Sequence, residues 1–568
     1  MLRRLAHWPH VCFGTPVFSF CFPHCLMSHP DALPPSSLAA DGAASTTVRE
    51  AVLGLLRAFG MRTVFGNPGS TELPLFLDFP EDFRYVLGLQ ESVVVGMADG
   101  YAQATRNAAF VNLHSAAGVG HAMGNIFTAF KNRTPMVITA GQQARSILPF
   151  DPFLFSGQAA ELPKPYVKWS IEPARAEDVP LAIARAYYVA MQQPQGPVLV
   201  SIPADDWSRR CEPVAPRTVS TEHRPEPAVL AQIGAALDAA RRPAFVVGAA
   251  VDRNGAWEAV RALAERHRAA VFVAPMSGRY GFAEDHPQFA GFLPAMREKI
   301  VGLLAGHDLV FALGAPAFTY HVEGFGPHLP EGAALVQLTD DPQTTAWAPV
   351  GTSAVGSIRL SVQDLLARPA PTTPRSPPAP RTPAPRATPE GGRMPVAWLL
   401  QTLAELRAPD SVIVEESPSA RPVMHRHLPI LQSETFYTMC SGGLGHGMPA
   451  AVGVALAQPH KKVIALIGDG SAMYAIQALW SAAQLRLPIT FVIVKNRRYA
   501  ALQEFAPTFG FAPGAPLEGC DLPDIDFCAL ARGQGCDAAR VDDAHALHGV
   551  LRDAIAATRP TLVEVEVA

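Results

Sequence analysis

The stretch Val463-Ile-Ala-Leu-Ile-Gly-Asp-Gly-Ser-Ala472, together with Phe491-Val-Ile-Val-Lys-Asn496, decides the fold of this chain of 568 residues. Short continuous apolar blocks are typical of parallel strands that are buried on both faces. The glycines after the first block let the backbone come close to a ligand. A helix is expected over about 471–485, and the N-terminus of a helix attracts negative charge. The pattern predicts a strand, loop, helix and second strand around an anion-binding edge.

Two polar side chains, Asp469 and Asn496, each follow an apolar block after one intervening residue. Both offer hard oxygen ligands, which suit Mg²⁺ that carries phosphate groups. A Gly-Asp-Gly sequence alone is also typical of ordinary turns. With the two strands and the downstream asparagine, the signal becomes specific and predicts a magnesium–diphosphate site.

Strands and helices alternate along the rest of the chain, which predicts three doubly wound α/β domains with parallel sheets. The first domain opens with a capping box at Thr47 and Glu50, and its first helix ends at Gly60. We expect the domains over residues 46–215, 225–366 and 394–568. Further strands are expected at 63–65, 110–113, 136–139, 198–202, 244–247, 270–273, 309–313 and 335–338.

Two segments lie outside these domains. Residues 1–45 begin with a basic stretch, followed by an apolar part that Pro16 interrupts. This pattern favours a disordered extension, or a true start of the protein at Met27. Residues 367–393 are dense in Pro, Thr, Ala and Arg. Such a segment cannot bury enough apolar surface to fold, so we expect an extended linker whose arginines serve solvation.

Composition excludes several classes of protein. The net charge is only −4 and no basic block lies outside the Pro-rich segment, so electrostatics does not point to nucleic acid. No apolar run of about 20 residues is present, so we expect no membrane span. The eight cysteines form no CxxC pair, which fits reduced thiols in the cytoplasm. Cys520, Cys528 and Cys536 have the wrong spacing for a zinc site.

Further motifs stand along the chain, and those that carry Ser70 and His114 follow predicted strands. They are Gly66-Asn-Pro-Gly-Ser-Thr-Glu72, Leu89-Gln-Glu-Ser92, Gly96-Met-Ala-Asp-Gly-Tyr-Ala102, Asn112-Leu-His-Ser-Ala-Ala-Gly118, Gly314-Ala-Pro-Ala-Phe-Thr-Tyr-His321 and Ser441-Gly-Gly-Leu-Gly445. With the Gly-Asp-Gly-Ser site, the chain resembles the benzoylformate decarboxylase branch of the thiamine diphosphate-dependent decarboxylase family. The resemblance runs from about Thr46 to the C-terminus, interrupted by the linker.

The resemblance implies thiamine diphosphate and Mg²⁺ as cofactors and a small 2-oxo acid as substrate. It identifies the three domains as pyrimidine-binding, central and diphosphate-binding. In this family the cofactor lies between the first domain of one subunit and the third domain of its partner. The expected assembly is therefore a homodimer or homotetramer.

The family pattern also implies roles for single residues. Glu91 would bond a ring nitrogen of the cofactor, and an apolar surrounding favours the protonated carboxyl that this needs. Leu444 would support the bent cofactor, while the Gly442 carbonyl accepts from its amino group. His114 and His321 would relay protons, since histidine titrates near neutral pH. Ser70 would bond the substrate carboxylate or carbonyl.

The diphosphate end of the cofactor has its own expected residues. The metal ligands would be Asp469, Asn496 and the backbone carbonyl of Arg498. The phosphate contacts would come from Gly468, Gly470, Ser471, Ser417, Ser419 and Tyr499.

The chain departs from the family pattern at two places. The usual Asn-Asn-Gly-x-Tyr-Gly is here Lys495-Asn-Arg-Arg-Tyr-Ala500. The added cations either crowd the metal–diphosphate or point outward. Pro418 stands where a small hydroxyl residue often contacts diphosphate.

Three functions remain open from sequence. The leading one is a carboxy-lyase that converts an aryl 2-oxo acid, benzoylformate first, to benzaldehyde and carbon dioxide. The second is a carboligase of the acetolactate synthase type with a bound flavin. The third is a non-catalytic cofactor-binding paralogue, which the altered loop suggests. The candidate aromatic pocket is Tyr474, Phe505, Phe436 and Leu502, with a spacing that fits core packing equally well.

Overall fold

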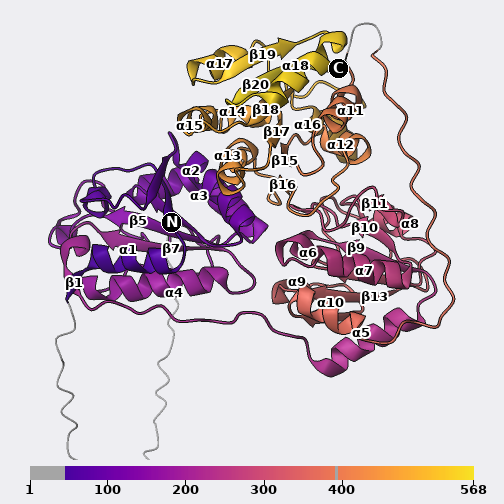
Figure 1. Cartoon of the computed structure of the whole chain (residues 1–568), viewed down its shortest axis with the longest axis horizontal. Coiled ribbons are helices and arrows are strands. Elements are labelled where there is room, and N and C mark those ends of the chain that lie inside the picture. The colour runs from indigo at the N-terminus through magenta and orange to yellow at the C-terminus, as the bar shows by residue number, and fades with distance from the viewer. Residues whose placement is uncertain (1–44, 390–393) are drawn as a thin grey trace, which may run out of the picture. The chain divides into compact units, whose positions relative to one another are not determined.

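The computed structural model describes residues 45–389 and 394–568, which contain three six-stranded sheets with parallel strands (Figure 1). This confirms the predicted fold class, and every strand that the sequence predicts is present. The expectation for the N-terminal segment lies outside the described residues, apart from Ser45. No described helix combines the length and apolar character that a bilayer crossing requires.

The first sheet has the strand order β3-β2-β4-β5-β7-β6. Its strands are β2 (Thr63–Gly66), β3 (Arg84–Leu87), β4 (Ala109–Leu113), β5 (Met136–Gln142), β6 (Ser170–Ile171) and β7 (Pro197–Pro203). Its helices are α1 (Val48–Ala58), α2 (Glu91–Thr105), α3 (Ser115–Asn132) and α4 (Val179–Met191). The capping box of α1 is present, with Glu50 N–H bonded to the Thr47 hydroxyl. A short antiparallel pair, β1 (Thr46–Thr47) and β8 (Arg210–Cys211), ties down the start of the domain.

The second sheet has the order β11-β10-β9-β12-β13-β14. Its strands are β9 (Pro243–Val247), β10 (Ala270–Val273), β11 (Phe289–Phe292), β12 (Leu309–Leu313), β13 (Ala334–Thr339) and β14 (Thr352–Val355). Its helices are α5 (Pro227–Ala239), α6 (Ala249–Arg253), α7 (Trp257–His267), α8 (Arg297–Leu303), α9 (Pro342–Ala346) and α10 (Ile358–Leu366).

The third sheet has the order β16-β15-β17-β18-β20-β19. Its strands are β15 (Val412–Glu416), β16 (Phe436–Thr438), β17 (Val463–Gly468), β18 (Thr490–Lys495), β19 (Asp537–Val541) and β20 (Thr561–Glu566). Its helices are α11 (Val396–Leu406), α12 (Arg421–His427), α13 (Gly447–Ala457), α14 (Asp469–Met473), α15 (Ala478–Gln484), α16 (Ala500–Phe505), α17 (Phe527–Gly533) and α18 (Ala544–Ala556).

One predicted helix is wrong in extent. The expected helix over 471–485 is two helices, α14 and α15, separated by turns at residues 474–477. Between them the amides of Ala475 and Ala478 bond carbonyls three residues back, rather than four. This tighter bonding interrupts the α-helical ladder and turns the chain.

Helices α2 and α13 pack closely because glycines lie where they meet. A Cβ on Gly100 would overlap the Ala450 carbonyl, and a Cβ on Gly453 would overlap the Met97 carbonyl. Small residues let two helix backbones approach each other more closely than larger side chains would. The contact joins the first domain to the third.

A buried ion pair lies in this contact. His446 Nε2 is 2.7 Å from Asp99 Oδ2, and both side chains are fully buried. Asp99 also accepts hydrogen bonds from Gln103 and Asn132, each at 2.9 Å. Burial acts against both charges, but their attraction outweighs it, so the pKa of His446 is raised and that of Asp99 lowered. Breaking a pair of this kind leaves an uncompensated buried charge.

The linker is extended as predicted, but its arginines are not merely solvated. Over residues 367–389 it has no helix or strand. Arg375 donates to the carbonyls of Leu237 (2.6 Å) and Ala240 (2.7 Å) at the end of α5. The last carbonyls of a helix have no intrahelical partner, so a guanidinium satisfies them well. The solvation role is therefore wrong for Arg375.

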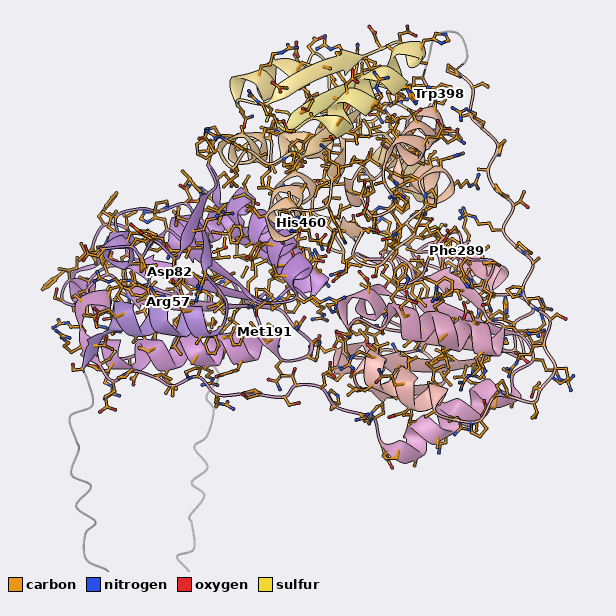
Figure 2. The ribbon with its side chains drawn as sticks, in the orientation of Figure 1. Arg57, Asp82, Met191, Phe289, Trp398 and His460 are labelled. Atoms are coloured by element: carbon orange, nitrogen blue, oxygen red, sulfur yellow. The ribbon has the colours of Figure 1, made fainter. Side chains whose placement is uncertain are left out.

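Two more linker arginines contact the folded chain. Arg381 donates to the His425 carbonyl at 2.6 Å and lies over the Phe289 ring. Arg386 pairs with Glu405 and lies over the Trp398 ring. Phe289 and Trp398, labelled in Figure 2, mark these two anchor points. The linker is thus bound to the folded chain at several separate points. The expectation that the linker arginines serve only solvation is wrong for Arg381 and Arg386 as well.

We expect Arg375→Ala to make residues 367–389 more susceptible to proteolysis. The change removes hydrogen bonds from a charged donor, each contributing about 1.5–3 kcal/mol, so the segment should open at least about tenfold more often. Limited digestion with proteinase K, followed by mass spectrometry, measures the cleavage rate. Arg386→Ala, which removes a more exposed anchor, is the matched control and should have a smaller effect. Equal rates for wild type and Arg375→Ala would contradict the anchoring role.

Candidate active site

Three predicted site residues lie at the carboxyl edge of the first sheet. Ser70 is on the loop after β2, Glu91 is the first residue of α2, and His114 directly follows β4. Ligand sites in open parallel sheets form at this edge. Ser70 is exposed, whereas Glu91 is buried.

A carboxylate orients His114. Its Nδ1 lies 2.8 Å from Oε2 of Glu72, a buried side chain that the sequence did not single out. Glu72 also accepts from the Gly69 amide (2.8 Å) and the Thr71 hydroxyl (2.6 Å). Because an amide and a hydroxyl both donate to this carboxylate, its position is fixed, and it faces Nδ1 of His114 as a hydrogen-bond partner. The Nε2 of His114 is then left to face a ligand.

Glu91 also has a partner that the sequence did not reveal. Its Oε2 lies 3.1 Å from Nδ1 of His121, which is two turns along α3. Behind Glu91, Val93, Val94 and Val95 are fully buried. The expected burial of this carboxyl group is confirmed, and a solvated surface position is excluded.

The two expected metal ligands come together at the third sheet. β17 and β18 are neighbours, so Asp469 and Asn496 follow adjacent strands. The Asp469 carboxylate accepts from the amides of Gly470 (2.8 Å), Asn496 (3.0 Å) and Arg497 (2.6 Å). Burial raises the pKa of Asp469. Asn496 Oδ1 lies 3.1 Å from the Arg498 amide, so the side-chain oxygens of Asp469 and Asn496 both contact the backbone of residues 496–498.

The surrounding residues fit a diphosphate. The Ser417 hydroxyl is buried and has no hydrogen-bond partner among the described residues. The Ser419 hydroxyl is 3.5 Å from Asn496 Nδ2. A Cβ on Gly468 would lie 3.6 Å from the hydroxyls of Ser417 and Ser471. Hard oxygen donors next to hydroxyl groups and glycine backbone suit a metal-bound diphosphate.

Close packing explains Gly470 and Tyr499. A Cβ on Gly470 would overlap the Tyr499 ring, so only glycine fits there. Tyr499 is therefore held against the Gly-Asp-Gly turn, on the loop that also carries Arg498.

A second buried carboxylate shapes the loop that carries Gly442 and Leu444. Glu416, at the end of β15, accepts from the amides of Gly445 (2.7 Å), His446 (2.7 Å) and Gly447. Burial raises the pKa of Glu416, although these amides act against the shift. Gly442 has a φ of 74°, which glycine adopts without strain. The sequence analysis did not find Glu416, because its role depends on tertiary contacts.

The candidate aromatic pocket is only partly supported. The rings of His321 and Phe505 pack with centroids 4.7 Å apart. Tyr474 and Leu502 are exposed. Phe436 is buried in the core and stacks on Tyr280 at 4.1 Å, so it does not line a pocket. The physical reason is that β16 is the edge strand of the third sheet, where Tyr280 covers Phe436.

The site residues fall into two groups on one chain. Ser70, Glu91 and His114 belong to the first domain, whereas Asp469, Asn496 and His321 belong to the other two. Within residues 45–389 and 394–568, no hydrogen bond or ion pair joins Glu91 or His114 to Asp469 or Asn496.

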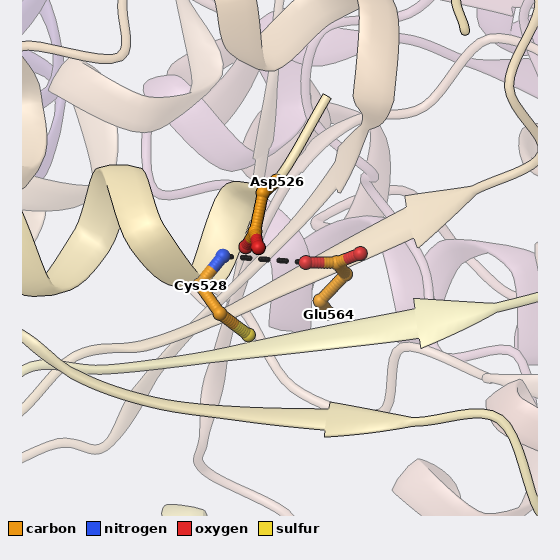
Figure 3. A group of neighbouring side chains, drawn as sticks. All are labelled: Asp526, Cys528 and Glu564. Atoms are coloured by element: carbon orange, nitrogen blue, oxygen red, sulfur yellow. Dashed lines mark hydrogen bonds between the residues drawn. The ribbon is translucent and has the colours of Figure 1, made fainter. Parts of the chain in front are cut away.

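Another cluster of possible ligands lies beside the third sheet. Asp526, Cys528 and Glu564 offer atoms within 4.8 Å of one another (Figure 3). However, Glu564 already pairs with Lys495 (2.6 Å) and Arg540 (3.2 Å). Burial raises the pKa of the Cys528 thiol to about 11, which disfavours the thiolate that binds metals. The cluster is therefore an ion-pair network and not a metal site.

Comparison with sequence families assigns all three domains. Residues 46–159 match "Thiamine pyrophosphate enzyme, N-terminal TPP binding domain", 230–365 match the "central domain" and 419–565 match the "C-terminal TPP binding domain" of the same family.

Individual relatives agree with this match. A benzoylformate decarboxylase of Pseudomonas aeruginosa is 46% identical over 529 residues, covering 91% of this chain and 98% of the relative. An acetolactate synthase large subunit of Parasynechococcus marenigrum is 30% identical, covering 91% and 87%. The structure of a thiamine diphosphate-dependent 4-hydroxybenzoylformate decarboxylase of Rhodococcus jostii superposes with a TM-score of 0.88 at 40% identity, covering 92% and 99%.

We expect Ser417→Ala to stabilise the cofactor-free protein but to weaken thiamine diphosphate binding about tenfold. A buried hydroxyl without a partner costs about 1–3 kcal/mol, and the same hydroxyl would bond a phosphate oxygen. Melting temperature and calorimetric titration with the cofactor and Mg²⁺ measure the two effects. The Ser411 hydroxyl is also buried without a partner. Ser411→Ala should therefore stabilise the protein and leave cofactor affinity unchanged. Equal affinity for wild type and Ser417→Ala would argue against the phosphate contact.

Proposed function

Because this chain belongs to the thiamine pyrophosphate enzyme family, we propose that it is a thiamine diphosphate- and Mg²⁺-dependent carboxy-lyase acting on an aryl 2-oxo acid. Benzoylformate, giving benzaldehyde and carbon dioxide, is the proposed substrate. The 46% identity to a benzoylformate decarboxylase across 98% of that relative supports this choice. The observation that carries the proposal is the His114–Glu72 pair beside the exposed Ser70.

In this proposal, different residues would bind the metal, the phosphates and the ring of the cofactor. Bound thiamine diphosphate supplies the electron sink for the decarboxylation. Asp469, Asn496 and the Arg498 carbonyl would hold Mg²⁺, and Ser417 and Ser419 would contact the phosphates. Glu91 would hold a proton at a ring nitrogen of the cofactor, and Leu444 would support the cofactor by packing.

The proposed substrate site combines residues of the first domain with the packed rings of His321 and Phe505. Ser70 bonds the substrate carboxylate or carbonyl. His114 moves a proton through Nε2, because Glu72 occupies its Nδ1. His321 provides the second imidazole, and its ring packs on Phe505. An aromatic side chain at this place suits an aryl substrate, since rings pack favourably on rings.

The site requires two subunits in this proposal. Glu91 and Asp469 share no contact within the described chain, and the first domain of one subunit would complete the third domain of its partner. Large apolar side chains are exposed on the first domain at Leu73, Phe150 and Phe153. Exposed apolar surface of this kind marks interfaces. We propose a homodimer as the minimal active unit, with a homotetramer as the larger assembly.

A cytoplasmic location fits the cysteines. The five cysteines in the described residues are all free, and four of them are buried. Reduced thiols are typical of a reducing compartment.

A flavin-binding carboligase is less well supported. In doubly wound sheets, nucleotides bind in the crevice where the strand order reverses, which in the central domain lies between β9 and β12. Here a Cβ on Gly248 would overlap Ala315 and the Gly314 carbonyl, so the segments that follow β9 and β12 pack directly against each other. The non-catalytic alternative is opposed by the contact of the Asp469 carboxylate with the Asn496 amide and by the oriented His114.

We expect the purified protein to produce benzaldehyde from benzoylformate when thiamine diphosphate and Mg²⁺ are added. A coupled dehydrogenase assay measures the product. Glu91→Gln should lose at least about 10²-fold in kcat, since it removes a positioned acid–base group. Normal turnover by Glu91→Gln would rule out its role. Cofactor binding without turnover of any 2-oxo acid would instead favour the non-catalytic paralogue.

We expect Glu72→Gln to lower kcat about 10²-fold while KM changes little. The amide can no longer hold the charged form of His114, although it keeps the shape of the site. The pH profile of kcat should shift as well, because the imidazole loses its ionised partner. Glu72→Asp should restore part of the activity. An unchanged pH profile in Glu72→Gln would show that Glu72 serves packing alone.

A further inference from the structure

Three cations, Lys495, Arg497 and Arg498, flank the proposed metal ligand Asn496. A free cation next to a bound Mg²⁺ weakens the binding of the metal by repulsion and competes for its carboxylate ligand. The backbone amide of Arg497 lies 2.6 Å from Asp469 Oδ2. The side chain of Arg497 therefore starts within reach of the carboxylate that would hold the metal.

Two glutamates of β20 neutralise the cations on either side of Asn496. Glu564 and Glu566 are two positions apart on one strand, so they lie on the same face of the sheet. Lys495 Nζ is 2.6 Å from Glu564 Oε1. The Arg497 guanidinium pairs with Oε1 of Glu566. Both cations are thus turned toward the end of β20.

The two pairs differ in burial. Glu564 is fully buried and also accepts from the Cys528 amide at 3.2 Å, as Figure 3 shows. This pair joins the neighbouring strands β18 and β20, and removing one partner would leave an uncompensated buried charge. In contrast, the Arg497 side chain is 59% exposed and that of Glu566 is 27% exposed. The outer pair can be changed without opening the core.

The backbone at Arg497 does not require an arginine. Its φ is 60°, a left-handed conformation that glycine adopts more readily than any other residue. Its carbonyl accepts from the Leu522 amide at 2.7 Å, and this bond is independent of the side chain. Glycine at position 497 is therefore compatible with the observed loop.

We propose that Glu566 is a positioning residue for the metal–diphosphate site, because it holds the Arg497 cation away from Asp469. This inference rests on the proposed function, since it takes Mg²⁺ to bind at Asp469 and Asn496. Removing the negative charge of Glu566 frees a cation whose reach includes the metal site. Residues outside the ligand set change metal affinity by about 10–100-fold in comparable sites.

Calorimetric titration of Mg²⁺ at saturating thiamine diphosphate tests the proposal on the full-length protein. Glu566→Gln should raise the dissociation constant for Mg²⁺ about tenfold. The double variant Glu566→Gln/Arg497→Gly should restore the wild-type value, because the freed cation is gone. If the pair only holds the loop together, the double variant binds Mg²⁺ no better than Glu566→Gln, and the proposal is overturned.

A matched control removes the partner of an exposed arginine elsewhere. Glu222 pairs with Arg359 at 2.6 Å, with side chains that are 46% and 38% exposed. Glu222→Gln should leave Mg²⁺ affinity unchanged. Equal affinity for wild type and Glu566→Gln overturns this inference alone. A wild-type protein that binds neither Mg²⁺ nor thiamine diphosphate overturns the proposed function together with it.

Discussion

The close packing of α2 against α13 is the constraint on which the rest of the site depends. Gly100 and Gly453 bring the two backbones together, and the buried Asp99–His446 pair fixes their alignment. The first residue of α2 is Glu91, and the loop with Leu444 leads into α13. Two functional elements of different domains are therefore placed by one helix contact. A larger side chain at either glycine would move both elements at once.

Much of the fold could be predicted because its strands are buried on both faces. Val463–Ile467 and Phe491–Val494 are continuous apolar runs, and only a central parallel strand buries them completely. The break between α14 and α15 has no comparable signal in the sequence. It arises where backbone amides bond carbonyls three residues back instead of four, and this change needs no particular residue type. The linker arginines were misjudged for a related reason. Composition shows that a segment cannot form a core, but not that carbonyls at the end of α5 lie within its reach.

Some residues of the candidate site could likewise be predicted from the sequence, and others could not. Asp469, Asn496 and His114 could be found because each directly follows an apolar strand. Glu72, Glu416 and His121 could not, since their contacts depend on how loops meet in space. Glu72 and Glu416 are carboxylates that accept several hydrogen bonds and support other groups. They act on the chemistry only through His114 and through the loop before α13.

The linker has a consequence for how this chain changes over evolutionary time. Arg375, Arg381 and Arg386 fasten it at separate points, and the residues between them have no regular structure. Doubling the length of a free segment costs only about 0.6 kcal/mol. Insertions and deletions between the anchors are therefore nearly neutral, whereas loss of an anchor is not. We therefore expect homologous chains to differ more in the length of this connection than at the arginines that fasten it.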